Sequence, residues 1–108
     1  LTMPKTNALL AFSEINALLD TYGKLLTNHQ QSLMSDYYLF NLSLKEIAEQ
    51  QGISRAAVAD TLQKAKTSLH HFEKVLNLKS IKDQLQSLSD DVTMPLALKK
   101  KIITILKG

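Results

Sequence analysis

The sequence predicts an all-α protein, and three observations support this fold class. Apolar residues make up 44% of the 108 residues, and most recur at steps of three and four, as on one face of a helix. No segment alternates apolar and polar residues as a half-buried strand does. With three glycines and two prolines, little of the chain has to form loops. By its length, we expect one helical domain spanning residues 1–108.

Two helices are predicted in residues 7–40. The first covers residues 7–22 and ends at Gly23, and the second follows Thr27 as its N-cap and runs to about Phe40. Apolar spacing predicts one buried stripe on each helix. The expected buried residues are Leu9, Phe12, Ile15, Leu18, Leu19 and Tyr22 in the first, and Gln30, Leu33, Met34, Tyr37, Leu39 and Phe40 in the second.

A helix-turn-helix is predicted next, and the whole unit spans residues 43–76. Ser43 with Glu46 has the spacing of a capping box, Gly52 suits the left-handed residue that ends a helix, and Ser54 suits a second N-cap. Only residues 52–54 join the two helices, so they have to cross steeply. An ordinary helical hairpin within a bundle is the alternative.

The second helix of this motif is predicted to be unusually long. No glycine or proline interrupts residues 55–78, so the helix extends over about 22 residues, roughly 33 Å. Its apolar residues are separated by alternating steps of four and three, namely Val58, Leu62, Ala65, Leu69, Phe72 and Leu76. Leu69, Phe72 and Leu76 form a seam that needs a partner, either the chain's own C-terminal helices or a second subunit.

Two short helices are predicted in the tail, residues 80–107. One runs from Ser80 to about Ser89, and the other has Pro95 in its first turn and continues to residue 107. The last helix carries a cluster of three lysines, Lys99 to Lys101, on its expected outer side.

The charge is distributed unevenly along the chain. The net charge is +3, but residues 1–54 carry three lysines against five acidic residues, whereas residues 55–108 carry ten basic residues against five acidic ones. The basic half begins at the second helix of the motif. This asymmetry favours a polyanionic partner, although lysines also cover ordinary solvated helix faces.

Five residues are candidates for contact with nucleic acid. Arg55, the only arginine, stands at the start of the second motif helix, where it could contact a guanine or a phosphate. It could equally pair with Glu46 or Glu49 on the protein surface. Lys45, Lys64 and Lys66 are expected to contact phosphates, and Gln63 also points outward.

Other outward positions on the same helix argue against strong base recognition. Ala56 and Ala59 offer no hydrogen-bonding group to a base, and Asp60 repels phosphate. The motif therefore favours weak or sequence-tolerant binding.

The residues needed for catalysis or metal binding are not found. The chain has no cysteine, and His29, His70 and His71 lack the spacing of metal ligands. No nucleophile with its base and no glycine-rich phosphate loop is present, so we expect no catalytic residue, no metal and no cofactor. No apolar run approaches the ~20 residues of a membrane span, so we expect a cytoplasmic protein without a membrane partner.

Part of the chain resembles region 4 of bacterial sigma factors, namely Leu26, Thr27, Gln30 and the runs 42–49 and 52–58. Nothing resembles the parts of a sigma factor that bind the core polymerase and read the −10 promoter element, so we do not expect a sigma factor. A closer resemblance starts at residues 16–22, continues through 25–27, 36–38 and the motif, and fades after Leu78. Over these residues the chain is similar to the small YlxM-like proteins of Gram-positive bacteria and mollicutes.

The resemblance to YlxM-like proteins implies a regulatory or DNA-binding protein that works with the signal recognition particle, because genes of that family lie beside the gene for the particle's GTPase. After Ser54 and Arg55 the family usually reads Gln-Ala-Val-Tyr-Asp, whereas residues 56–60 lack the Gln and the Tyr. The scaffold of the motif is kept while two side chains suited to base contacts are lost. Lys99 to Lys101 would suit the particle's RNA as well as DNA.

Two hypotheses follow. In the first, the protein binds DNA or the particle's RNA through the motif, weakly or as a homodimer. In the second, it keeps the scaffold without reading DNA and binds the particle's GTPase, or a second copy of itself, through Leu69, Phe72 and Leu76.

Overall fold

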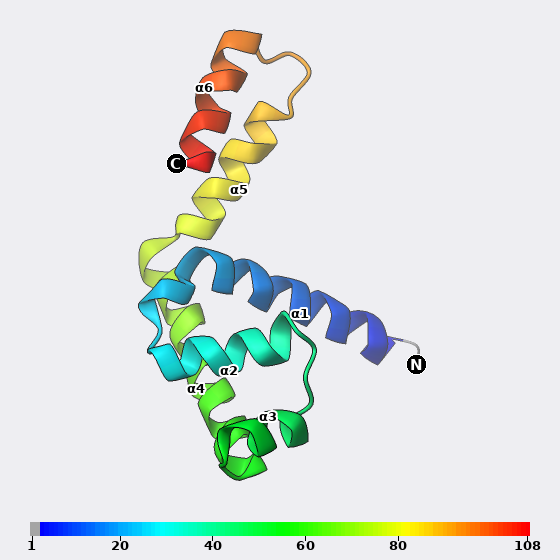
Figure 1. The fold of residues 1–108 in the computed structure, drawn as a ribbon. Coiled ribbons are helices and arrows are strands. Elements are labelled where there is room, and N and C mark those ends of the chain that lie inside the picture. The colour runs from blue at the N-terminus through cyan, green and yellow to red at the C-terminus, as the bar shows by residue number, and fades with distance from the viewer. Residues whose placement is uncertain (1–2) are drawn as a thin grey trace.

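The computed structural model describes residues 3–108, with side chains described from residue 11, and every regular element in this part of the chain is helical, which confirms the all-α class (Figure 1). The elements are α1 (Met3–Tyr22), a 3-10 helix η1 (Gly23–Leu25), α2 (Asn28–Tyr38), α3 (Leu44–Gln51), α4 (Arg55–Leu76), α5 (Leu78–Ser89) and α6 (Leu96–Lys107).

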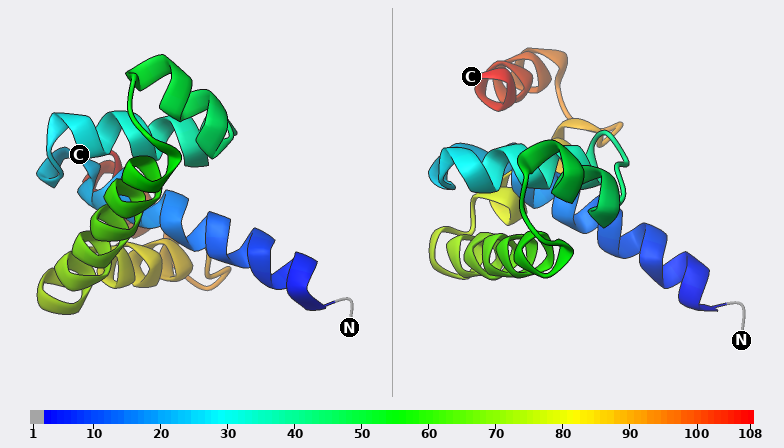
Figure 2. Two further views of the ribbon diagram at one scale, coloured as in Figure 1. Left: turned by 90° about the horizontal axis from the view of Figure 1, so that it is seen from below. Right: turned by 60° about the horizontal axis from the view of Figure 1, so that its bottom comes forward.

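Helices α1, α2 and α3 pack against the long helix α4 and form the body of the protein, residues 3–76. Helices α5 and α6 pair with each other as a tail hairpin, residues 78–107, which projects from the end of the body opposite α3 (Figures 1 and 2). The molecule measures 54 × 37 × 24 Å. Its radius of gyration is 17.1 Å, against ~13 Å for a compact chain of this length.

The hydrophobic core lies entirely within the body. It is one cluster formed by Ile15, Leu18, Leu19, Tyr22, Leu26, Leu33, Met34, Ile47, Ala48, Val58, Leu62, Ala65 and Leu69. The stripes predicted on α1 and α4 supply most of these residues, so apolar spacing identified the core faces correctly.

The end of the second helix differs from the prediction. Helix α2 ends at Tyr38, and Leu39 and Phe40 are 57% and 68% exposed rather than buried. Asn41 has a left-handed φ of 57°, which turns the chain toward α3 and carries both side chains away from the core. Gln30, also expected on the buried side, instead caps the helix: its Oε1 accepts from the Thr27 backbone N–H at 3.1 Å.

Three helix boundaries also differ from the sequence pattern. Helix α1 begins at Met3 instead of residue 7, α5 begins at Leu78 instead of Ser80, and α6 begins after Pro95 instead of including it. The predicted burial of Leu9 falls on a side chain outside the described ones. The early start of α5 has a clear physical cause, which is the hydrogen bonding of its first turn.

Two side chains from the body cap the first turn of α5. The Tyr22 hydroxyl accepts from the backbone N–H of Leu78 at 2.9 Å and donates to the Glu73 carboxylate. Glu73 also accepts from the backbone N–H groups of Lys79 and Ser80, each at 3.1 Å. These bonds satisfy three amides that a helix start leaves unpaired, so α5 begins directly after Asn77.

The turn of the motif has the predicted geometry. Ser43 and Glu46 form both bonds of a capping box, and the Ser54 hydroxyl accepts from the Ala57 N–H at 3.0 Å. Gly52 is left-handed, with φ 68° and ψ 33°, and the Ile53 N–H donates back to the Ala48 carbonyl at 3.1 Å. This is a Schellman ending, which reverses the chain within three residues.

Replacing Gly52 by alanine is expected to lower the free energy of unfolding by about 1–2 kcal/mol, because a Cβ disfavours the left-handed conformation. No atom lies within 4 Å of the added Cβ, so the cost comes from the backbone alone. Urea unfolding followed by circular dichroism measures it. The matched control is Gly23→Ala, whose Cβ would meet Leu19 at an ordinary 3.4 Å. Equal stability of the two variants would contradict the assignment.

Replacing Glu73 by glutamine is expected to lower the free energy of unfolding by about 1.5–3 kcal/mol at neutral pH, since bonds to a charged acceptor are lost. The hydrogen bond from Tyr22, followed by those from the Lys79 and Ser80 amides, holds the pKa of Glu73 below its ordinary value of 4.5. The carboxylate therefore stabilises the fold above that pH and loses its effect as the pH falls through the lowered value.

The pH dependence provides the check on Glu73. Unfolding measured from pH 7 downward should show the wild type and Glu73→Gln converging in stability at acidic pH. Glu49→Gln, which changes an exposed glutamate of α3, serves as the control and should follow the wild type throughout. A constant difference between wild type and Glu73→Gln at every pH would refute the role of the charge.

Candidate nucleic-acid interface

The core of the body fixes how the two motif helices cross. Ile47 and Ala48 of α3 are buried against Val58 and Leu62 of α4, and the small side chain of Ala48 allows the helices to approach closely. Ile53 in the turn packs partly against the same cluster. The first turns of α4 therefore project from the body as a rigid, exposed helix start.

Arg55 and Lys45 lie on either side of the motif turn. Together with Glu49 and residues of the turn, they line a shallow hollow of about 370 Å³. The alternative role for Arg55 is an ion pair with Glu46 or Glu49. Among the described side chains, Arg55 forms no ion pair with either of them. The guanidinium is therefore exposed at the positive end of a helix dipole.

Three of the predicted residues follow one side of α4. Arg55, Gln63 and Lys66, with Ala59 between the first two, are separated by four, four and three residues, which places them in one line along a helix. We refer to these four residues as the α4 row. Arg55, Ala59 and Gln63 are exposed, whereas Lys66 is half-buried.

The far end of the α4 row borders an aromatic cluster. Lys66 lines two adjoining hollows, of about 410 and 220 Å³, with Tyr37 and Tyr38, and Gln63 lines the smaller one. The ring of Phe12 lies 5.6 Å from that of Tyr37 and 4.8 Å from that of Tyr38. All three rings pack on each other at the rim of the core, and they give the α4 row an apolar border.

Lys64 does not belong to the α4 row. It lies on another side of α4, where its Nζ is 3.0 Å from the Asp60 carboxylate, and both side chains are largely exposed. Such a pair contributes little stability, but it partly neutralises a lysine predicted to contact phosphate. Ala56 and Ala59 are exposed, as expected, and provide no hydrogen-bonding groups.

The predicted partner seam is largely occupied within the chain. Leu69 is fully buried in the core of the body, and the ring of Phe72 lies 6.0 Å from that of Tyr22 on α1. Only Leu76 remains open, at 45% exposed. Leu69 belongs to the core of the body and Phe72 packs against it, so both side chains have neighbours within residues 3–76.

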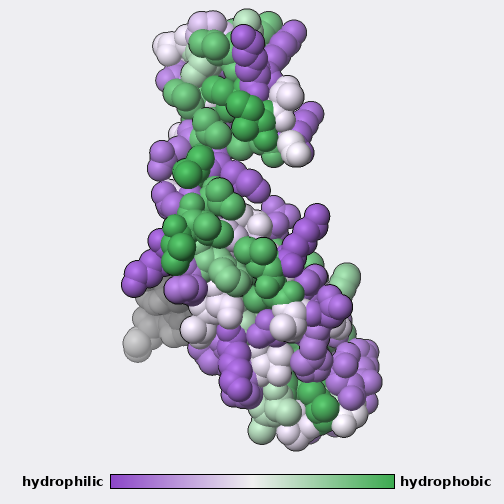
Figure 3. Space-filling view, turned by 90° about the vertical axis from the view of Figure 1, so that its left-hand side faces the viewer, coloured by the Kyte–Doolittle hydropathy of each residue, from purple (hydrophilic) through white to green (hydrophobic). Residues whose placement is uncertain are grey.

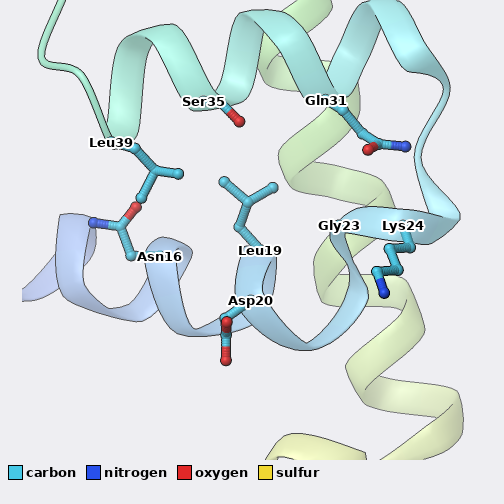
Figure 4. Close-up of a pocket in the computed structure, with 8 residues that line it drawn as sticks. All are labelled: Asn16, Leu19, Asp20, Gly23, Lys24, Gln31, Ser35 and Leu39. Atoms are coloured by element: carbon cyan, nitrogen blue, oxygen red, sulfur yellow. The ribbon is translucent and has the colours of Figure 1, made fainter.

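A further hollow of about 300 Å³ lies between α1 and α2 (Figure 4). Leu19 and Ser35 face each other across it, while Asp20 points away, and the Gln31 amide donates to the Leu26 carbonyl at 2.9 Å. Its polar groups do not converge on one point, so it lacks the arrangement of a ligand site. Among the described residues, no group of histidines and carboxylates could hold a metal ion, and no helix is long and apolar enough to cross a membrane.

Sequence reasoning missed the pair formed by Tyr22 and Glu73. Apolar spacing predicts Tyr22 as a core residue and gives Glu73 no role beyond a surface charge. A usable signal existed, because a buried tyrosine hydroxyl needs a hydrogen-bond partner. The partner lies 51 residues away and could not be identified from spacing.

Comparison with known proteins agrees with this architecture. A sequence profile of the family described as "Putative helix-turn-helix protein, YlxM / p13 like" matches residues 11–108. A UPF0122 protein of Desulforamulus reducens is 49% identical over 69 residues, which cover 64% of this chain and 59% of the relative. Those of Malacoplasma penetrans and an Exiguobacterium species are 45% identical over 67 residues and 41% over 88 residues.

The shares of the chains that align differ among these relatives. The match to the Malacoplasma protein covers 62% of this chain and 63% of the relative, and the match to the Exiguobacterium protein covers 82% and 77%. This chain thus spans about three fifths of the length of the first two relatives. The profile match covers both the body and the tail hairpin and confirms the resemblance seen in the sequence. The chain belongs to the YlxM / p13-like helix-turn-helix family.

Proposed function

We propose that this chain is a cytoplasmic, non-enzymatic protein that binds nucleic acid through the start of α4 and works with the signal recognition particle. The observation that carries the proposal is the exposed α4 row. It begins with Arg55 at the tip of a helix that projects rigidly from the body, and Lys45 stands across the turn. Helix-turn-helix proteins place this part of the second helix against nucleic acid.

Phosphate contacts are expected to dominate the binding. Arg55, Lys45 and Lys66 supply positive charge, whereas Ala56 and Ala59 occupy positions from which a longer side chain would reach a base edge. Each phosphate contact adds a salt-dependent term that is independent of sequence. Such a surface tolerates many sequences and accepts RNA as readily as DNA, which fits the RNA of the particle as a target.

The lysines of α6 extend the possible contact area. Lys100 and Lys101 are exposed in the tail hairpin, at the end of the molecule opposite α3 (Figure 1). A nucleic acid that touches both ends would have to follow the 54 Å length of the protein, roughly 16 base pairs at 3.4 Å per pair. The link to the particle rests on the family resemblance.

A second candidate function is that of an interaction module accessory to the particle's GTPase. Two features of α4 favour this second function, namely the exposed Ala56 and Ala59 and the pairing of the Asp60 carboxylate with Lys64. Both leave few groups on α4 that could bind nucleic acid. In this case the motif serves as a scaffold for protein contacts.

The double change Arg55→Ala with Lys66→Ala should weaken binding to labelled particle RNA and to random duplex DNA by at least tenfold at low salt. Removing two phosphate contacts should also lower the slope of log K against log salt by about 1–2. The matched control, Lys24→Ala with Lys74→Ala, removes the same charge at exposed sites outside the α4 row and α6. If both double variants lost affinity equally, net charge rather than the α4 row would explain binding.

The second function predicts that the tagged protein retains the purified GTPase of the particle after nuclease treatment. Retention without nucleic acid is expected because protein contacts would carry the complex. The measurement is a pull-down with and without nuclease, with Ala59→Arg as a variant that places a long charged side chain in the α4 row. A complex that disappears with nuclease would assign the association to shared nucleic acid and exclude direct contact.

A further inference from the structure

Half of the chain's phenylalanines and tyrosines gather at one place, where α1, α2 and α4 meet. Phe12, Tyr37 and Tyr38 are three of the six such residues, and all three are half-buried. They line the hollow of about 410 Å³ at the far end of the α4 row, a size typical of small-ligand pockets. We call it the aromatic hollow. The lining residues that carry the argument are Phe12, Glu14, Tyr37, Tyr38, Lys66 and His70.

The three rings leave surfaces on which a flat ligand can stack. The plane of Phe12 is inclined by 32° to that of Tyr37 and by 53° to that of Tyr38, and the two tyrosines meet at 78°. No pair is parallel, so the rings do not fully cover each other's faces. Burial, followed by the neighbouring Tyr37, raises the pKa of Tyr38 above its ordinary value of 10.0, so this hydroxyl keeps a proton to donate.

The two tyrosine hydroxyls have no protein partner among the described side chains. The hydrogen bonds that tyrosine hydroxyls form there all belong to Tyr22. A base edge offers both donors and acceptors, so the hydroxyls of Tyr37 and Tyr38 can pair with it.

The aromatic hollow lies in line with the α4 row. Lys66 is the last residue of the row and lines the hollow, and His70 follows one helical turn further on. Arg55 and Lys66 are eleven residues apart, which is about 16 Å along the helix axis. About five stacked nucleotides, at ~3.4 Å each, cover this distance. A strand whose phosphates follow the row can therefore place one of its bases in the hollow.

We propose that the aromatic hollow binds an unpaired base of a nucleic acid whose phosphates lie along the α4 row. The proposal rests on the nucleic-acid binding proposed above and narrows it to single strands and loops. A base within a duplex is stacked between its neighbours, so only an unpaired base has a free face to place on an aromatic ring. Stacking tolerates any base, in keeping with the lack of base-reading groups at Ala56 and Ala59.

Glu14 favours a base over a phosphate inside the hollow. Its carboxylate repels phosphate, whereas it can accept a hydrogen bond from the exocyclic amino group of a base such as cytosine. Lys66 supplies positive charge from α4, where the row would hold the phosphates. The hollow thus suits the two parts of a nucleotide separately, with the base toward α1 and α2 and the phosphate toward α4.

The tail hairpin offers no comparable surface for a base. Figure 3 shows apolar side chains gathered over α5, α6 and the end of α4, and exposed residues such as Leu98 and Ile105 belong to the hairpin. Residues 78–107 contain no phenylalanine, tyrosine or tryptophan, however. A binding preference that depends on aromatic rings therefore cannot come from the hairpin.

Fluorescence anisotropy at low salt tests the base site with two labelled probes. One is a single-stranded deoxycytidine oligomer, and the other is an abasic deoxyribose-phosphate chain of equal length and charge. The wild type should prefer the oligomer by about five- to a hundredfold, as expected for one stacked base. Tyr37→Leu with Tyr38→Leu should lose this preference yet keep its affinity for the abasic chain, because the phosphate contacts remain.

Two further variants complete this series. Tyr37→Phe with Tyr38→Phe keeps the rings, so it should lose less of the preference than the leucine variant. The matched control is Phe40→Leu, which removes a 68% exposed ring outside the hollow and should keep the full preference. Circular dichroism verifies that each variant keeps its helices.

The outcomes separate the base site from the phosphate surface. Equal affinity of the wild type for the oligomer and the abasic chain would overturn the base site and leave the proposed phosphate binding standing. Binding of neither chain would overturn both. Equal losses in the leucine and phenylalanine variants would assign the preference to the hydroxyls and overturn stacking.

Fluorine NMR provides a readout without disturbing the rim of the core. The chain has three tyrosines, so labelling with 3-fluorotyrosine gives three signals, and Tyr22, only 1% exposed, serves as the internal reference. The oligomer should shift the signals of Tyr37 and Tyr38 more than the abasic chain does and leave that of Tyr22 in place. Signals that move only when the purified GTPase of the particle is added would assign the hollow to a protein and overturn the proposal.

Discussion

The hydrogen bonds that join Tyr22, Glu73 and the first turn of α5 determine how the two parts of the molecule are placed. They connect the end of α1 with the end of α4 and the start of α5, which lie 51 and 56 residues further along the chain. A charged acceptor that pairs with two backbone amides and a buried hydroxyl is among the stronger interactions available to a protein. The left-handed Asn77 and the packing of α5 against α1 also set the direction in which the tail hairpin leaves the body.

The body and the tail divide the tasks of the molecule. The body buries a complete core and presents a rigid helix start, whereas the tail hairpin remains apolar on its outside and basic along α6. The nucleic-acid contact proposed for the α4 row needs only the body, because Ile47, Ala48, Val58 and Leu62 hold the motif in place. The exposed apolar residues of the tail hairpin take no part in this core.

Local signals predicted much of this fold, and nonlocal contacts account for what they missed. The capping box at Ser43, the left-handed Gly52 and the uninterrupted apolar spacing of α4 are properties of short segments, and all were correct. Spacing reveals an apolar face but not which helix covers it, so it did not predict that Leu69 belongs to the core of the body and that Phe72 packs against it. The candidate site could be predicted in part: helix spacing predicted outward positions for Arg55, Gln63 and Lys66, but it could not predict the pairing of Lys64 with Asp60.

The cap on α5 also affects the order in which a newly made chain can complete its fold. Tyr22 and Glu73 belong to segments that leave the ribosome before residues 78–107, so the groups that stabilise the first turn of α5 are in position when that turn is synthesised. Starting a helix is its most costly step, since several residues are fixed before the first internal bond forms. The body thus supplies the hydrogen-bond partners on which α5 can start.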